Sequence, residues 1–147
     1  MEGNATVGQL LHEKGYEVWT TSPSTPVFDA LEEMARRNVG ALVVVNGERI
    51  AGVFSERDYA RKIILAGRSS KGTTVEEIMT REVVTVGRSA TVRECLELMT
   101  EKRVRHLPVL DEGRLVGVVS IGDAVKSIIR EQESLIEQLQ TYITGAI

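Results

Sequence analysis

Apolar and polar positions follow one pattern twice along this chain. Residues 18–64 align with residues 83–129 at a constant shift of 65, without a gap, and 17 of the 47 aligned pairs are identical. In the first copy, Val27, Leu31 and Met34 have the spacing of one helix face, while Leu42 and Val44 alternate as in a strand. Because identities recur where structure demands them, the sequence predicts two copies of one folding unit.

Each copy predicts the same elements: a short helix, a strand, a helix, two strands and a final helix. The first copy places them at 7–11, 18–21, 27–37, 41–45, 50–54 and from Asp58. The second places them at 75–79, 83–86, 92–102, 107–110, 115–120 and from Asp123. The fold class is therefore α/β (α+β). One copy of about 60 residues would bury only a marginal core, so we expect the two to pack sheet against sheet.

Helix starts and turns carry their own sequence signals. Thr25-Pro26 predicts a capping residue followed by proline at the first helical position, and Thr91 with Glu94 predicts a capping box. Asn46-Gly47 and Glu112-Gly113 predict tight turns between paired strands.

Composition shifts predict the domain boundaries. The Gly/Ser/Thr-rich stretch 67–74 separates a first domain, 1–66, from a second, 75–130, and three extra residues fall within His12–Glu17. Residues 131–147 predict an amphipathic helix that covers either the protein's own surface or a second subunit.

Bulk composition narrows the classes of protein. The chain is 42% hydrophobic and 27% charged with a net charge of −3, which favours neither nucleic acid nor an anionic membrane as a partner. No basic leader and no apolar run of about 20 residues is seen, so we expect a soluble protein. Cys95, the only cysteine, is expected to be a buried structural thiol, and its isolation suits the reducing cytoplasm. His12 has no partners for a metal site.

These patterns resemble the cystathionine-β-synthase (CBS) domain, and the chain from Val7 to Ile129 looks like a stand-alone CBS pair, or Bateman module. The resemblance is carried by Val18-x-Thr20 and Val83-x-Thr85, by Val39-Gly-Ala-Leu42, by Arg105-His-Leu-Pro-Val109, and by Gly-x-x-Ser-x-x-Asp in both copies. It implies two βαββα units with three-stranded sheets, related by a pseudo-twofold axis. It also implies adenosine-containing ligands between the sheets, and pairing into a homodimer.

The motifs ending in Ser55-x-x-Asp58 and Ser120-x-x-Asp123 are the main candidate site residues. Each lies where a strand gives way to a helix, and a carboxylate there can accept hydrogen bonds from a ribose diol while the serine contacts phosphate. The same residues can instead cap the helix on their own. The resemblance favours the ligand-binding interpretation.

Further ligand-binding residues follow from the resemblance. Val39 and Val104 would line adenine slots beside the extended segments that hold Trp19 and Val84, and Thr80 is assigned to the ligand as well. The valines also fit an ordinary core, and Trp19 fits a core or a subunit interface.

Basic residues make the two sites unequal. Arg105 and His106 stand where the first copy has Gly40-Ala41, and the resemblance implies that they reach the phosphate of the ligand held by Asp58, the site that also has Arg57. The Asp123 site has Gly122 instead. Alternatively, Arg105 belongs to a solvated basic helix end.

We therefore expect a regulatory sensor of AMP, ADP, ATP or NAD that signals to an effector protein by a conformational change, with no obligatory cofactor, no nucleic acid and no membrane as partners. Two alternatives stay open: a ligand-independent dimerisation or docking module, and a sensor of S-adenosylmethionine. Because the sequence carries no catalytic motif, an enzyme is not expected.

Overall fold

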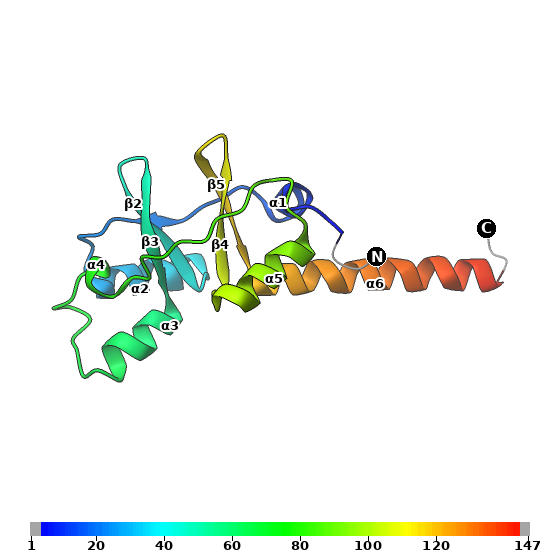
Figure 1. The fold of residues 1–147 in the computed structure, drawn as a ribbon. Helices are drawn as coiled ribbons and strands as arrows, with labels where there is room; N and C mark the ends of the chain where they lie inside the picture. The colour runs from blue at the N-terminus through cyan, green and yellow to red at the C-terminus, as the bar shows by residue number, and fades with distance from the viewer. Residues whose placement is uncertain (1–3, 145–147) are drawn as a thin grey trace. The chain divides into compact units, whose positions relative to one another are not determined.

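The computed structural model describes residues 4–144, so the first three residues and the last three of the predicted tail lie outside the described residues. The chain divides into two compact units (Figure 1). We call residues 17–84 the repeat-1 unit, and residues 4–16 together with 85–144 the repeat-2 unit. The chain's opening segment thus belongs in space with the second copy of the repeat, and the residues just after 67–74 belong with the first.

The repeat-1 unit has a three-stranded sheet in the order β1-β2-β3, with β1 parallel and β3 antiparallel to β2. Its core joins α2 and α4 to this sheet through Val27, Met34, Leu42, Phe54 and Ile78. The elements are β1 (Thr20–Thr21), α2 (Val27–Arg37), β2 (Ala41–Asn46), β3 (Arg49–Ser55), α3 (Glu56–Tyr59), a π-helical turn (Ala60–Ile64) and α4 (Val75–Ile78).

The repeat-2 unit repeats this plan with a smaller sheet. Strands β4 and β5 pair antiparallel, and a single parallel bridge joins Val86 to Val109. Its buried apolar residues include Leu11, Val92, Met99 and Leu107. The elements are α1 (Val7–Lys14), α5 (Val92–Lys102), β4 (His106–Asp111), β5 (Arg114–Ser120) and α6 (Ile121–Thr144).

Pro108 explains why the third strand predicted in the second copy shrinks to one bridge. In the repeat-1 unit, the Val43 N–H donates to the Trp19 carbonyl at 3.2 Å. Pro108 occupies the position of Val43 in the repeat and has no N–H to donate. Only the bonds on either side of it remain, from the Val86 N–H to the Pro108 carbonyl and from the Leu110 N–H to the Val86 carbonyl.

A glycine that recurs in both copies lets a short helix and the residues next to it pack closely on each sheet. The helix is α4 in the repeat-1 unit and α1 in the repeat-2 unit. A Cβ built on Gly52 would lie 2.7 Å from the Thr80 carbonyl oxygen, and one built on Gly117 would lie 2.7 Å from a Leu11 methyl. The glycine of the repeated Gly-Val-x-Ser motif therefore serves packing.

The predicted helices 27–37 and 92–102 are found with these bounds, and Thr91 forms its capping box with Glu94. The predicted cap of the first helix is wrong. Pro26 itself is the N-cap, without a side-chain bond, because linker carbonyls satisfy the first N–H groups: Val27 N–H donates to Thr73 at 2.8 Å. The Thr25 hydroxyl pairs with Ser22 instead.

The first hairpin turn differs from its prediction by one residue. Asn46 still pairs with Arg49, so the turn residues are Gly47 and Glu48, with Gly47 at a φ of 66°. A positive φ at the first turn position suits glycine, which the predicted Asn46-Gly47 turn would have placed second.

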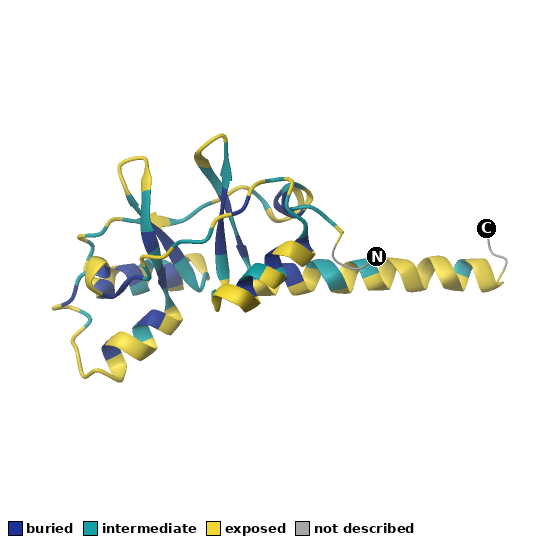
Figure 2. Ribbon diagram, viewed as in Figure 1, coloured by how far each residue is buried: buried dark blue, intermediate teal, exposed yellow. Residues whose placement is uncertain are grey.

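The predicted tail is not a separate element, because it continues the last repeat helix as part of α6. Figure 2 shows that exposed residues dominate its C-terminal half. The exposed residues of this half include large apolar ones: Leu135, Ile136, Leu139, Tyr142 and Ile143. No helix in residues 4–144 combines the length and the apolarity needed to cross a membrane.

Candidate functional site

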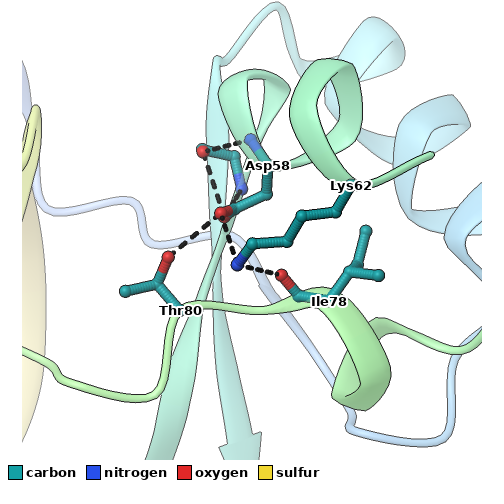
Figure 3. A network of polar contacts seen from close by, with 5 residues as sticks. Asp58, Lys62, Ile78 and Thr80 are labelled. Atoms are coloured by element: carbon teal, nitrogen blue, oxygen red, sulfur yellow. Dashed lines mark hydrogen bonds and ion pairs between the residues drawn. The ribbon is translucent and has the colours of Figure 1, made fainter. Parts of the chain in front are cut away.

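Asp58 is the centre of a polar network in the repeat-1 unit (Figure 3). Its Oδ2 accepts hydrogen bonds from the Ser55 N–H at 3.0 Å and the Ser55 hydroxyl at 3.1 Å. Its Oδ1 accepts from the Thr80 hydroxyl at 3.0 Å and lies 3.3 Å from the Lys62 ammonium. Only 7% of Asp58 is exposed, so this carboxylate is both buried and fully oriented.

Local sequence builds the network. Ser55 ends β3 and caps α3, and the Asp58 N–H donates to its hydroxyl at 3.2 Å, so the two residues form a reciprocal capping box. Thr80 reaches the carboxylate because its backbone pairs with Val53 in both directions. Lys62, four residues after Asp58, also donates to the Ile78 carbonyl at 2.9 Å. Helix, strand and linker therefore converge on one carboxylate.

The repeat-2 unit holds Asp123 in a related way. Its Oδ2 accepts from the Ser120 N–H at 2.9 Å, and the Asp123 N–H donates to the Ser120 hydroxyl at 3.1 Å. The Lys14 ammonium contacts the same Oδ2 at 2.6 Å and the Val118 carbonyl at 2.6 Å. Burial acts to raise the pKa of Asp123, but the Lys14 ammonium and the Ser120 N–H outweigh it, so the pKa lies below its usual value and the carboxylate stays charged.

The capping interpretation of both Ser-x-x-Asp motifs is therefore confirmed. It is compatible with ligand binding, because capping fixes the direction in which each carboxylate points. In the repeat-2 unit, both donors reach Oδ2. Oδ1 is then the oxygen that an incoming hydroxyl would use, and Asp123 is the more accessible carboxylate, with 20% of its side chain exposed against 10% for Asp58.

The other site residues predicted in the repeat-1 unit are not among the hydrogen-bond and ion-pair partners of Asp58 described above. Trp19 and Val39 pack against the core, and the Arg37 guanidinium lies 3.9 Å from the centre of the Trp19 ring. Arg37 thus occupies one face of the only tryptophan. Arg57 is exposed and Val84 is half-buried at the end of the unit.

The site residues predicted in the repeat-2 unit gather near the start of α6. The Ile121 N–H donates to the Arg105 carbonyl at 2.9 Å, which places Arg105 at the same helix start as Asp123. Arg105 and Gly122 are exposed, whereas Val104 and His106 are half-buried. A contact from Arg105 or His106 to the ligand of Asp58 would join the two units and stays a prediction.

Neither Lys14 nor Lys62 is among the site residues predicted from the sequence. Lys62 could have been found, because a lysine four residues after an aspartate on a helix is a common ion pair. Lys14 carries no such signal, since it lies 109 residues from Asp123 in the chain.

Two other features lie away from these carboxylates. A groove of about 1520 Å³ in the repeat-2 unit is lined by residues within 5–16, 88–93 and 127–138, and so lies apart from Ser120 and Asp123. No group of three metal-ligating side chains was found among the described residues. Cys95 is fully buried, and burial raises its pKa to about 11, which makes it an unreactive thiol as expected.

Fold and site together define a class: an α/β protein of two repeats, each of which holds a carboxylate at the start of a helix with a capping serine. A family model for the CBS domain matches residues 7–65 and again 75–130. The chain therefore belongs to the CBS domain family and carries the domain twice.

Known relatives agree with this assignment. The chain is 42% identical to the mitochondrial CBS domain-containing protein CBSX3 of Arabidopsis thaliana, over 97% of this chain and 73% of that protein. Among solved structures, a protein with CBS domains from Burkholderia ambifaria is 52% identical, covers 87% of this chain and 96% of its own, and has a TM-score of 0.83. The CBS domain protein PAE2072 of Pyrobaculum aerophilum, solved in complex with AMP, is 26% identical with a TM-score of 0.71, over 80% of this chain and 88% of its own.

Proposed function

We propose that this protein is a regulatory sensor that binds adenine nucleotides through Asp58 and Asp123 and transmits their presence by a change of conformation. The observation that carries the proposal is that both copies hold a carboxylate in a fixed direction by a capping serine. An oriented, charged carboxylate suits the two hydroxyls of a ribose, and a relative with the same fold binds AMP.

The residues around each carboxylate fit such a ligand. At Asp123, a ribose hydroxyl can donate to Oδ1 without displacing the Ser120 N–H from Oδ2. At Asp58, the Thr80 hydroxyl would turn away from Oδ1 to admit the ribose and could then contact it. Arg105, at the start of α6, and the exposed Arg57 supply positive charge for phosphate.

Isothermal titration calorimetry with AMP, ATP, NAD, S-adenosylmethionine and adenosine tests the proposal. Wild type should bind at least one of them, and Asp58→Asn and Asp123→Asn should each remove binding at one site. Asp29→Asn, an exposed acidic residue of α2, is the matched control and should bind like wild type. The proposal fails if no adenine compound binds at millimolar concentration.

A sensor that catalyses no reaction needs a partner protein that recognises its ligand-bound or ligand-free conformation. Ligand binding would shift the populations of two conformations of the pair, and an effector protein would bind one of them. The sensor itself has a single cysteine, Cys95, which is consistent with function in a reducing compartment such as the cytoplasm.

A second candidate function, dimerisation independent of ligand, is favoured by the exposed apolar residues of α6. Leu135, Ile136 and Leu139 are each about half exposed, at 52%, 54% and 51%, although they recur at helical spacing. Light scattering would show a dimer that Leu139→Glu converts to a monomer, while Asp58→Asn and Asp123→Asn leave the dimer intact. A monomeric wild-type protein at all concentrations would exclude this function.

A further inference from the structure

Lys14 takes over in the repeat-2 unit two contacts that Thr80 makes in the repeat-1 unit. The Thr80 N–H donates to the Val53 carbonyl at 2.9 Å, and its hydroxyl donates to Asp58. The equivalents of Val53 and Asp58 are Val118 and Asp123, and the Lys14 ammonium contacts both at 2.6 Å. A neutral threonine in one copy is therefore replaced by a full positive charge in the other.

The placement of Lys14 follows from the irregular part of the repeat. The lysine is the last residue of α1 and lies within His12–Glu17, where the first copy has three residues more than the second. Gly15 follows at a φ of 108° and lets the chain leave the helix there. Glu13, next to the lysine, pairs with Arg130 of α6 at 2.8 Å, so the end of α1 is held against the helix that carries Asp123.

Charge balance gives this contact a consequence for ligand choice. A lone carboxylate beside a ribose repels the phosphate of the same ligand, whereas a carboxylate paired with an ammonium does not. The helix position that supplies Lys62 to Asp58 is Ser127 in the second copy, so the cation at Asp123 comes from α1 rather than from the helix itself.

We infer that Lys14 is a specificity-determining residue of the Asp123 site, which it tunes toward anionic adenine nucleotides and against adenosine and the cationic S-adenosylmethionine. The inference rests on the proposed function. It assigns Lys14 two roles: it holds Asp123 through Oδ2, which leaves Oδ1 for a ribose hydroxyl, and it offsets the negative charge of Asp123, which would otherwise repel the phosphate of the ligand.

The test follows the side-chain carboxyl carbon of Asp123 by NMR, assigned with Asp123→Asn, during titrations with AMP, adenosine and S-adenosylmethionine. This signal reports ligand binding at the Asp123 site alone, and the measurement uses the full chain. In wild type, AMP should bind more tightly than adenosine. Lys14→Met should reduce that preference about tenfold, because the Asp123 carboxylate would then repel the phosphate without compensation, and should strengthen S-adenosylmethionine relative to AMP.

Two further variants separate contact from overall charge. Lys14→Arg keeps the charge and should keep the preference for AMP. Lys126→Met removes an exposed lysine of the same helix as Asp123 and should leave the preference unchanged. Should Lys14→Met not fold, Lys14→Gln is the second neutral variant, and the same predictions apply to it.

The outcomes distinguish this inference from the proposed function. Binding of AMP to wild type with the same AMP-to-adenosine ratio in Lys14→Met overturns the inference and leaves the proposed function standing. An Asp123 pKa that does not rise in Lys14→Met also overturns it, because the ion pair would then be absent in solution. Failure of wild type to bind any adenine compound overturns the proposed function and the inference with it.

Discussion

Replacing Gly52 by alanine should destabilise the repeat-1 unit by crowding the segment that carries Thr80. The new Cβ would lie 2.7 Å from the Thr80 carbonyl oxygen and 2.8 Å from the Met79 sulfur, whereas ordinary contact begins at 3.4 Å. The obstacle is backbone, and it is fixed by two hydrogen bonds between Thr80 and Val53. The neighbouring segment must therefore move rather than rotate a side chain away.

The expected cost is about 2 kcal/mol, within the range of about 1–3 kcal/mol for overpacked cores. With a urea m-value of about 1–3 kcal/mol/M, the unfolding midpoint should fall by about 1 M. Trp19, the only tryptophan, lies in the same unit, so its fluorescence follows this unit specifically. Because Thr80 donates to Asp58, the variant should also weaken ligand binding at that carboxylate.

Alanine substitutions at two other glycines provide comparisons for the loss of stability in Gly52→Ala. At Gly117 the obstacle is the side chain of Leu11, which can adjust in part, so Gly117→Ala should cost less, about 1 kcal/mol, by far-ultraviolet circular dichroism. At Gly72 the nearest atom is 3.7 Å away, so Gly72→Ala should leave the midpoint unchanged or raise it slightly. Equal midpoints for Gly52→Ala and Gly72→Ala would refute the packing argument.

Four more predictions concern single residues. Thr91→Ala removes the hydroxyl that caps the Glu94 N–H and should cost about 1 kcal/mol in urea unfolding. Arg103 has a φ of 56°, so Arg103→Gly should relieve about 1 kcal/mol of strain and raise the Tm by about 2–4 °C in calorimetry. Cys95, with its pKa raised to about 11, should react with a thiol reagent at pH 8 only after unfolding. The lowered pKa of Asp123 stabilises the fold above the unfolded pKa of 3.8, and this stability is lost as the pH falls through the folded value, so Asp123→Asn should flatten the stability profile below about pH 4.

The helices and the antiparallel strand pairs could be predicted because the apolar residues of each element have helical or strand spacing in both copies of the repeat. Two aligned copies also separate structural signals from chance, since a chance pattern would not recur at one fixed shift. The loss of the third strand in the second sheet was predictable as well. Pro108 replaces Val43 at a position that must donate a hydrogen bond, and that rule needs no structure.

Other features depend on which parts of the chain meet in space. The first N–H group of α2 donates to a carbonyl of the linker, that of Thr73, and no local pattern near Pro26 predicts this capping contact. Likewise, α1 precedes the first copy but belongs to the repeat-2 unit, and α4 precedes the second copy but belongs to the repeat-1 unit. This exchange of the two short helices brings Lys14 to Asp123. Local propensity carries no information about such pairings, which tertiary packing decides.

The same exchange of short helices alters the difference in positive charge between the Asp58 site and the Asp123 site. The sequence predicts more positive charge at the Asp58 site, because Arg105 and His106 are assigned to it and because Arg57 aligns with Gly122. In the structure, Asp123 has its own cation, closer than the one at Asp58: 2.6 Å for Lys14 against 3.3 Å for Lys62. A repeat can keep its fold while its charges move to different elements, so site chemistry in such a pair has to be compared contact by contact rather than position by position.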